Sequence, residues 1–589
     1  MASARCALAI AFAFVASVSS ATDMAAQQRD SARVLPLREL VVSATRAETE
    51  LANVPVNMTV ITHDDLTRSA AQNLEDVLME IPGLGFQRNV VSASAHPSWQ
   101  AVSLRGLGGT AASRTLVLVD GVPLNDGYFG WVRWNEIPIE TIERIEIVRG
   151  GGSTVWGAQS LAGVIHIITR TPRSAGLSVG AQGGDQSTFR GDAMATFGSN
   201  RVGGFVAAEA LNTDGYTLTT PSQRGAVDVP SSSDHVALRG KVSIDASETV
   251  RFIATGSYFD QDKINATRLR PNSTEAGFGQ VGLRIGKPGG SRLAINAFGQ
   301  GQTYQNAISS VAEGRDSESP ALSQFDIPSH AFGGNLLFSP ATLGPHLLTT
   351  GVDLETIHGE AYEDFLFRDG AFQNRRHTGG DQFLAGFFLQ DIIHASDRVE
   401  LVGGARLDVW HNTSGFREVS AIATGDVDVD TDFANRTEVR LSHNIGVRVR
   451  ASDRVSLRGS VYTGLRVPVL NELYKPFRAA GGIVTESNAG LDPERLLGIE
   501  AGLDYQLSRT WLARVTGFWN RVTDAILDAT ILEVETSQVV EPCGFVPAGG
   551  ACRQRQNLGT IRSAGVETEL EFRPAPAWLI GASLDVTPS

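Results

Sequence analysis

The stretch "RTLVLVDGVPLND", residues Arg114 to Asp126, has the pattern expected inside a small mixed α and β domain. An uninterrupted apolar run, Leu116 to Val119, is followed at once by Asp120-Gly121, a dipeptide that marks a turn. A short apolar run bounded by turn residues is typical of a strand that is buried on both faces. The stretch therefore predicts a small domain with its own buried core.

The neighbouring sequence extends this α+β unit over residues 51–171. Val56, Met58 and Val60 alternate with other residues as in a strand, and residues 64–83, which close on Pro82-Gly83, predict one helix. Further strands are expected at Val102–Arg105, at Thr115–Asp120, at Ile142–Val148 and, after a Gly-rich turn, in a last apolar run that ends near Arg170. About 120 residues is an ordinary domain size.

Residues 172–589 have a different pattern, with runs of about 10 residues in which polar and apolar side chains alternate. In "HVALRGKVSIDASETVRFIATGSYFD" two such runs are joined by a short turn at Ala246-Ser247-Glu248. Short turns alternate with long hydrophilic loops, which is typical of an outer-membrane β-barrel. A soluble β-sandwich is the alternative, but its turns would not favour one end so consistently.

The end of the sequence affects the expected strand count. We count about 17 alternating runs, whereas large plugged outer-membrane barrels have about 22 strands. The sequence stops at "DVTPS" without the aromatic strand that usually closes such barrels. Because an open barrel would leave unpaired strand edges in lipid, we expect that C-terminal strands are missing.

Residues 1–21 have the three parts of a secretory signal peptide: Arg5, the apolar run Cys6 to Val18, and small residues before Ala21. A short membrane anchor is the alternative, although the apolar run is too short to cross a bilayer. No later stretch reaches about 18 apolar residues, so a membrane location would require a closed barrel. Residues 22–50 are polar and predict a flexible segment. The net charge of −14 argues against a nucleic-acid partner.

The cysteines predict one disulfide and no metal site. Cys6 leaves with the signal peptide, and Cys543 and Cys552 lie close together in a Gly- and Pro-rich loop, as expected of a disulfide in an oxidising compartment. A zinc site would need further ligands nearby. Asp426, Asp428, Asp430 and Asp432 predict a hydrated acidic loop over residues 426–432; a calcium site is the alternative, without the Gly and distal Glu of an EF-hand loop. No metal or cofactor is expected.

Several ordered motifs resemble those of TonB-dependent outer-membrane receptors of the siderophore and cobalamin type. "RELVVSATR" is similar to the TonB box, here Glu39, Leu40, Val41, Val42, Ser43 and Ala44. The plug motifs are resembled by "VPVNMTVIT…LEDVLMEIPGL", "VSLRGLGG…RTLVLVDGVPLND" and "IERIEIVRGGGSTVWGAQSLAGVIHIITR", and a barrel motif by "GLRVPVLNELY", Gly464 to Tyr474. The resemblance covers residues 40–589.

The resemblance implies a mostly β protein: a large antiparallel transmembrane β-barrel, about 22 strands when complete, with the α+β plug domain in its lumen. It also implies a monomer in the bacterial outer membrane, in contact with lipid, that binds the inner-membrane protein TonB. Residues 39–44 would add as a strand to a sheet of TonB, and force on them would shift the plug. The alternative is that Leu40–Val42 is simply the first strand of the plug.

Plug arginines meet barrel glutamates in related receptors, and the matching residues here are Arg105, Arg149, Glu500 and Glu567. Pairing would avoid the cost of burying either charge alone. Ordinary solvated charges are the alternative.

The ligand candidates are mostly aromatic residues of the plug. They are Trp99, Tyr128, Phe129, Trp131, Arg133 and Trp134. Rings beside one cation suit a large, partly apolar, anionic metal chelate, and packing of the same rings against the barrel wall is the alternative. Haem is disfavoured, because no histidine follows the "ELY" motif and His96 is a lone loop histidine.

The expected function is energy-coupled import of a ferric siderophore, with cobalamin or another metal chelate or a carbohydrate as the alternative ligand. A passive porin or adhesin would not need the plug motifs, and a truncated remnant is a further alternative. No catalytic motif stands in a suitable context, so an enzyme is not expected.

Overall fold

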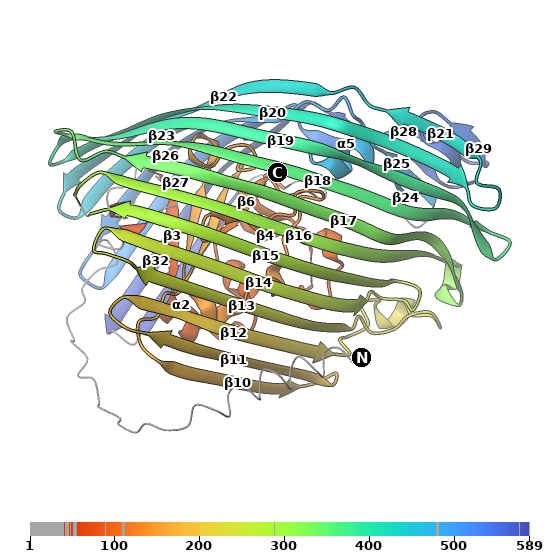
Figure 1. Cartoon of the computed structure of the whole chain (residues 1–589), viewed down its shortest axis with the longest axis horizontal. Coiled ribbons are helices and arrows are strands. Elements are labelled where there is room, and N and C mark those ends of the chain that lie inside the picture. Colours follow the sequence, from red (N-terminus) through yellow and green to blue (C-terminus); the bar gives the residue numbers. More distant parts are fainter. Residues whose placement is uncertain are drawn as a thin grey trace.

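The structure is a computed structural model that describes residues 40–41, 46, 49–50, 56–88, 90–108, 112–287, 289–478, 482–575 and 578–587. Two parts dominate it: one very large curved sheet, called the wall below, and a smaller domain, called the plug, that lies inside the curve of the wall (Figure 1).

The wall contains 18 strands, each hydrogen-bonded to its neighbours in antiparallel register. They follow chain order apart from the loop strands inserted between them: β10 (Gly176–Gly184), β11 (Thr188–Gly198), β12 (Val202–Thr213), β13 (Ser233–Asp245), β14 (Val250–Ile264), β15 (Pro271–Gly286), β16 (Arg292–Val311), β17 (Glu318–Ser339), β18 (His346–Arg368), β19 (Ala371–Ser396), β20 (Val399–Ala421), β21 (Val427–Asp432), β22 (Arg436–Ser452), β23 (Val455–Arg466), β26 (Glu494–Gln506), β27 (Trp511–Thr523), β32 (Thr560–Ala575) and β33 (Trp578–Val586). This confirms the mostly β fold with a large antiparallel sheet.

The two faces of the wall differ in polarity. On the outer face, Leu354 of β18 is 50% exposed and Ile445 of β22 is 68% exposed. On the inner face, Gln390 of β19 and Arg406 of β20 are buried against the interior. Successive strand residues point to opposite faces, so the period-two pattern produces an apolar outer surface and a polar lumen.

The two edges of the wall also differ. Short turns join strands along one edge, such as residues 246–249 between β13 and β14 and residues 397–398 between β19 and β20. Long connections lie at the other edge, including residues 467–493 and 524–559. The turn predicted at Ala246-Ser247-Glu248 is confirmed. Short turns face the periplasm in barrels of this kind, and long loops face the cell exterior.

The plug is built on a five-stranded sheet in the order β3 (Met58–Thr62), β8 (Ile142–Arg149), β9 (Gly163–Thr169), β6 (Thr115–Val119), β7 (Val122–Pro123). The stretch from Arg114 supplies β6, in which all five residues are buried. β6 pairs with β9 in parallel and lies in the plug core. β4 (Leu84–Phe86) and β5 (Val102–Leu104) form a separate antiparallel pair. The predicted strands in this region are confirmed to within about two residues.

The single helix predicted over residues 64–83 is wrong. The structure has two short helices, α2 (His63–Arg68) and α3 (Leu74–Leu78). Thr62 caps the first, accepting a hydrogen bond from the backbone N–H of Asp65. Asn73 precedes the second, and its backbone N–H and side-chain amide both donate to Asp76 Oδ2 at 3.3 Å. Ser and Asn bond readily to nearby backbone, so the intervening residues 69–73 interrupt the helix even though the apolar spacing continues.

The plug touches the wall on many sides, which places it in the lumen (Figure 1). Lys241 of β13 donates to Asp120, Lys263 of β14 donates to Ser92 and Ala95, and Glu500 of β26 accepts from Arg105. In the described residues, no helix is both long enough and apolar enough to cross a bilayer.

Candidate functional site

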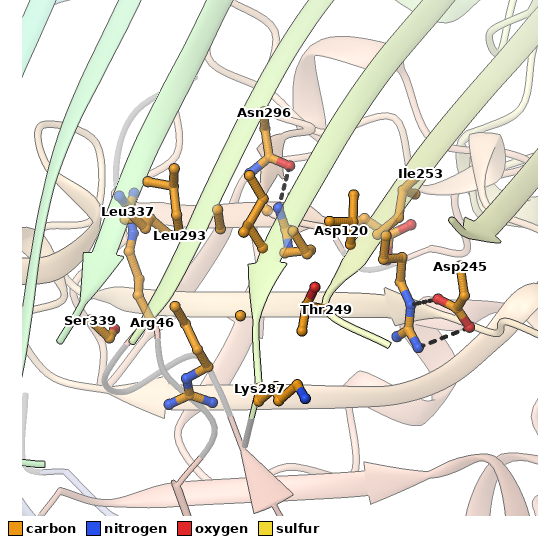
Figure 2. A pocket seen from close by; sticks show the side chains of 18 of the residues that line it. Arg46, Asp120, Asp245, Thr249, Ile253, Lys287, Leu293, Asn296, Leu337 and Ser339 are labelled. Atoms are coloured by element: carbon orange, nitrogen blue, oxygen red, sulfur yellow. Dashed lines mark hydrogen bonds and ion pairs between the residues drawn. The ribbon is translucent and has the colours of Figure 1, made fainter. Parts of the chain in front are cut away.

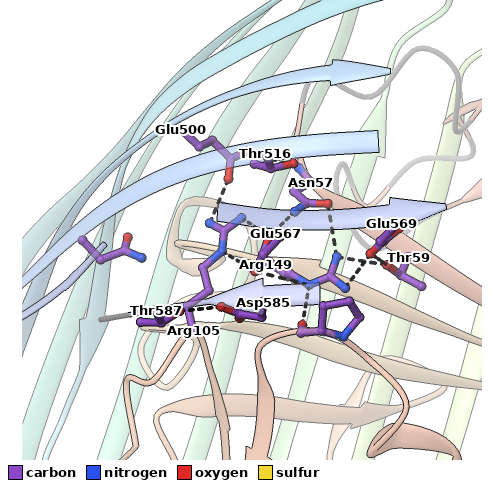
Figure 3. Close-up of polar contacts among 12 residues, drawn as sticks. Asn57, Thr59, Arg105, Arg149, Glu500, Thr516, Glu567, Glu569, Asp585 and Thr587 are labelled. Carbon is purple, nitrogen blue, oxygen red and sulfur yellow. Dashed lines mark hydrogen bonds and ion pairs between the residues drawn. The ribbon is translucent and has the colours of Figure 1, made fainter. Parts of the chain in front are cut away.

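The strongest contact between plug and wall is made by Arg105, which follows β5. Its Nη1 donates to Glu500 Oε2 at 2.9 Å, and its Nε and Nη2 donate to the two oxygens of Glu567, each at 3.0 Å (Figure 3). Its Nη1 also donates to the Tyr462 hydroxyl at 3.1 Å. Burial alone would lower the pKa of Arg105, but Tyr462, Glu500 and Glu567 together raise it. The guanidinium therefore stays charged in a site with no exposed surface.

Arg105 is presented by a tight turn. It has a positive φ of 54°, and Gly106 after it has a φ of 68°. The left-handed backbone conformation of an L-residue costs about 1 kcal/mol. The hydrogen bonds of the guanidinium to Glu500, Glu567 and Tyr462 offset this cost. The turn aims the side chain away from the plug core and into the wall.

Arg149, at the end of β8, makes a second contact beside the first. Its Nη2 donates to Glu569 Oε1 at 3.0 Å, and its Nε lies 3.8 Å from Glu567 Oε1 (Figure 3). Asn57 joins both arginines, because it donates to Glu567 at 2.5 Å and accepts from Arg149 at 3.1 Å. All four residues predicted from the resemblance meet here, whereas Glu569 was missed. Glu567 and Glu569 are two residues apart on β32, so the strand period brings both to the inner face.

A second buried network was not predicted. Arg114 of the plug donates to Glu494 of β26, with Nη2 2.6 Å from Oε1 and Nε 3.0 Å from Oε2. Glu494 also pairs with Arg466, and Arg466 Nη1 lies 2.9 Å from Glu472 Oε2. Glu472 lies in α5 (Leu470–Tyr474), so this network fixes the "GLRVPVLNELY" segment to the plug. The four residues are all buried.

Backbone groups meet where these networks adjoin. The Leu465 N–H donates to Ser153 Oγ at 2.7 Å, and the Leu465 carbonyl accepts from the Gln159 N–H at 3.2 Å. A Cβ on Gly464 would lie 2.6 Å from the Leu161 carbonyl oxygen. Gly464 is therefore required for plug and wall backbones to approach this closely.

The segment that resembles a TonB box is only partly described. Glu39, Val42, Ser43 and Ala44 lie outside the described residues. Leu40–Val41 forms β1, which pairs antiparallel with β2 (Thr49–Glu50). Val41 has no exposed surface and packs with Met58, Leu116 and Leu118 of the plug. In this conformation β1 is therefore docked on the plug, as in the alternative of a first plug strand.

Arg46, in the connection between β1 and β2, reaches across to the wall. Its Nη1 lies 2.6 Å from Asp353 Oδ1 on β18. Its guanidinium lies 4.1 Å from the centre of the Trp156 ring, which belongs to α4 (Ser153–Trp156), and 5.2 Å from that of Phe388 on β19. Asp353 also pairs with Arg406 of β20. Arg46 is the last residue of "RELVVSATR" and was not singled out from the sequence. It joins the N-terminal segment to both the plug and the wall.

Most of the predicted ligand residues are buried in contacts within the protein. Tyr128, Phe129 and Trp131 pack against Tyr304 of β16, with Phe129 stacked on Trp131 at 3.9 Å between ring centres. In this structure the rings pack against the wall, which is the alternative considered from the sequence, and their role in ligand binding stays a prediction. The same packing extends to α5, where the Asn471 N–H donates to the Tyr128 carbonyl at 3.0 Å.

The other candidates divide similarly. Trp134, in η4 (Trp134–Glu136), lies in the plug core and donates to the Gln100 carbonyl. Arg133 pairs with Glu136 at 3.0 Å and donates to Gln302 at 2.8 Å. Trp99, in η3 (Pro97–Trp99), is 57% exposed and is the one predicted ligand residue with a free ring face among those described. Nearby His96 is held through Nε2 by Asn306 at 3.1 Å.

The loops at the outer edge form a small sheet of their own. Its order is β24 (Phe477–Arg478), β25 (Ile483–Glu486), β31 (Ala551–Asn557), β28 (Ile526–Glu533), and the hairpin β29 (Gln538–Val540) and β30 (Gly544–Val546) adjoins it. Cys543 and Cys552 form a disulfide, buried beside Val484 and Val546. The disulfide therefore links the β29–β30 hairpin to β31 of the loop sheet.

The acidic stretch is a strand and not a loop. Val427–Asp432 forms β21, which pairs with β20 and is largely exposed. Among the described residues, no group of three or more His, Cys, Asp or Glu side chains is placed to hold a metal ion.

Comparison with known families matches nearly all of the described chain. Residues 50–164 match the TonB-dependent receptor plug domain, and residues 170–587 match the TonB-dependent receptor-like β-barrel. The second match alone covers more than half of the chain.

Two curated relatives differ in how much they align. The vitamin B12 transporter BtuB of Vibrio vulnificus is 31% identical over 184 residues, 31% of this chain and 29% of that protein. The iron-regulated outer membrane virulence protein of Vibrio cholerae is 25% identical over 576 residues, 90% of this chain and 75% of that protein.

Solved structures share the fold. The siderophore receptor PirA from Acinetobacter baumannii has a TM-score of 0.65 at 16% identity, covering 89% of this chain and 79% of that one. The ferric yersiniabactin uptake receptor FyuA from Yersinia pestis has a TM-score of 0.66 at 15% identity, covering 90% and 78%. With a plug joined by buried charges to a wall that is apolar outside, and with both family models matched, the chain belongs to the TonB-dependent receptor family of the bacterial outer membrane.

Proposed function

We propose that this receptor imports a ferric siderophore across the outer membrane, driven by force that TonB applies to the segment around β1. The observation that carries the proposal is the way the plug is held. Its contacts with the wall at Arg105, Arg114 and Arg149 are buried ion pairs and hydrogen bonds. Such contacts depend on geometry, so a small displacement breaks several of them together.

The segment on which such force would act, β1, is held by few contacts. In the part of the chain that the structure describes, β1 is held to β2 by two residue pairs, Leu40 with Glu50 and Val41 with Thr49. Force on the chain before Leu40 would peel these pairs and withdraw Val41 from its apolar contacts. The next described residue along the chain is Arg46, so continued pulling acts directly on its pairing with Asp353. A released β1 is also an extended segment of the kind that can add to a partner's sheet.

A ferric siderophore is the ligand class best supported. The Vibrio cholerae relative that aligns over 90% of this chain is iron-regulated, and PirA and FyuA are siderophore receptors with the same fold. Trp99 has an exposed ring. The loop that carries it is hydrogen-bonded to the inner face of the wall, through His96 to Asn306 and through the Ala95 carbonyl to Lys263. Vitamin B12 is the second candidate, favoured by the 31% identity to a B12 transporter over 184 residues.

The test is uptake by cells that lack their own receptors and express this chain. The probes are ferric enterobactin, ferric yersiniabactin and ferric citrate with radioactive iron, and cyanocobalamin with radioactive cobalt. We expect uptake of at least one ferric probe, and its loss when residues 39–44 are deleted or TonB is absent. Uptake that persists without TonB would show a passive pore, and uptake of cyanocobalamin alone would replace the siderophore.

A further inference from the structure

A cavity of about 780 Å³ opens between the plug and wall strands β13 to β17 (Figure 2). The plug contributes the Asp120-Gly121 turn, Trp156 and His166, and Arg46 lies at one side. The wall contributes Ser247, Glu248 and Thr249 of the turn between β13 and β14, and Gly286 and Lys287 at the end of β15. The cavity therefore lies at the periplasmic edge, far from the loops where a ligand first binds. Its volume is within the usual range for small-molecule sites.

The charges around this cavity are unequal. Three anionic side chains line it, those of Asp120, Asp245 and Glu248. Six cationic side chains line it: Arg46, Arg201, Arg251, Arg284, Lys287 and Arg292. Among the lining side chains this leaves an excess of three positive charges, one of which, Arg46, is paired with Asp353 outside the lining. A concave surface with an excess of one sign concentrates ions of the opposite sign.

The anions of the lining already have partners. Asp245 accepts from Arg251 at 2.5 Å and from Arg173 at 2.6 Å. Asp120 accepts from Lys241 at 3.2 Å and from the Thr169 N–H at 2.9 Å. Glu248 lies 3.7 Å from Lys287, but both side chains are well exposed, so this pair is weak.

Arg284 of β15 is different, because among the described residues it forms no ion pair. Its Nη1 donates to the amide oxygen of Asn296 at 2.9 Å, a neutral acceptor. Asn296 is itself buried and donates to Asn335 at 2.8 Å, so the acceptor is fixed in place. A guanidinium held in this way has donors left for an anion in the cavity.

We propose that this cavity is an exit site for an anionic metal chelate, held by Arg284 with Lys287 before it enters the periplasm. The inference rests on the proposed import function and adds the charge class of the ligand. Carboxylate or catecholate oxygens of the chelate would accept from Arg284. Arg46 lines the same cavity and pairs with Asp353 of the wall.

The first test measures anion binding directly. Hexacyanoferrate(III), a compact trivalent anion, is titrated into purified full-length receptor by calorimetry. We expect Arg284→Gln to weaken binding about tenfold, since one charge-assisted hydrogen bond is lost, and Arg284→Lys to retain most of it. Arg398→Gln, at another periplasmic turn, is the matched control and should bind as the wild type does. Equal binding by Arg284→Gln and the control, or no binding by the wild type, overturns the proposal.

The second test separates this site from the proposed function. Cells with each variant are given radiolabelled ferric enterobactin, and surface binding without energy is compared with the uptake rate. We expect Arg284→Gln to bind at the surface as the wild type does and to import several-fold more slowly. If the wild type imports and Arg284→Gln matches it, the exit site is wrong although import stands. If the wild type imports none of the ferric probes, import fails while the calorimetry still decides the site. A TonB fragment that competes with hexacyanoferrate would instead assign the cavity to a protein partner.

Discussion

Arg105 and Glu567 are 462 residues apart in sequence and form a buried ion pair between plug and wall that is joined by two hydrogen bonds. Glu567 serves Asn57 as well, and Arg149 lies 3.8 Å away. One carboxylate thus contacts three plug residues, so its removal disturbs several plug–wall contacts together.

Replacing Glu567 by Ala should loosen the plug. The change leaves Arg105 buried with only Glu500 as a charged partner, and breaking a buried pair in this way costs about 3–5 kcal/mol. Hydrogen exchange of the β3 and β8 amides should report a local unfolding free energy lower by that amount. Glu535→Ala, in an exposed loop, is the control and should change nothing. If Arg105→Met combined with Glu567→Met costs as much as the two single changes added together, the pair is not coupled.

Replacing Asp353 by Asn should release the N-terminal segment. Without its charge partner, Arg46 is held mainly by its ring contacts with Trp156 and Phe388. The docked state of β1 should be less populated, and the periplasmic domain of TonB should bind ligand-free receptor about tenfold more tightly, equivalent to about 1.4 kcal/mol. Surface plasmon resonance measures this affinity.

The control for that experiment is Asp391→Asn, on β19, because Asp391 is paired with His346 and not with Arg46. A gain in TonB affinity in the control as well would mean that general loosening of the wall, and not the Arg46 contact, exposes β1.

The sequence predicted the architecture well because the architecture depends on local patterns. Alternation over β13 and β14, the apolar run of β6 and the turn at residues 246–248 each follow from side-chain period and turn chemistry. Arg105 and Glu567 were found through family motifs, and no periodicity links residues so far apart. The Arg114 and Glu494 pair was missed for the same reason, since nothing in either local sequence names the other.

The aromatic loop shows where sequence reasoning stops. Phe129 and Trp131 suit a ligand surface and a packed interface equally well by residue type. The choice depends on how the plug docks, which brings Tyr304 against both rings. Likewise, the sequence of Leu40–Val41 predicts a strand whether the segment is free or docked, and it does not predict the antiparallel pairing with β2.

Removing the disulfide should soften one loop and leave the wall intact. The bond joins residues nine apart, and closure of so short a loop is worth about 2.5 kcal/mol in the chain-entropy model. Cys543→Ser with Cys552→Ser should therefore increase proteolysis within residues 533–557, measured by mass spectrometry of limited digests. Cleavage in the exposed loop at residues 424–426 is the internal control. Unchanged protection of residues 533–557 would show that the loop sheet alone holds the hairpin.

His166 should make plug stability depend on pH. Burial lowers its pKa from 6.5 to about 4, against the opposing effect of Glu146 and Asp120. The unfolded chain therefore takes up a proton at higher pH than the folded one. The stability that neutral His166 provides is complete above pH 6.5 and is lost as the pH falls toward 4, by at most about 1.4 kcal/mol per pH unit.

His166→Gln should reduce that loss. Hydrogen exchange of the β9 amides at pH 7, 6 and 5, corrected for intrinsic rates, gives the slope for each protein. His330→Gln, on the exposed outer face of β17, is the control and should keep the wild-type slope. A variant slope equal to that of the wild type would assign the pH dependence to other groups.

Trp99 and Trp131 should respond oppositely to truncation. Trp131 is 5% exposed and stacked on Phe129, so Trp131→Ala should lower the local stability of the plug by about 3–5 kcal/mol. Trp99 is 57% exposed, and a surface truncation should change stability by less than about 0.5 kcal/mol. If Trp99 contacts the ligand, its loss should weaken binding of the imported ferric probe about tenfold or more, because aromatic anchors dominate binding energy. Hydrogen exchange and fluorescence titration on both variants separate the two roles. If Trp131→Ala weakens ligand binding without lowering stability, Trp131 contacts the ligand. The loop that carries it would then have to open when the ligand binds.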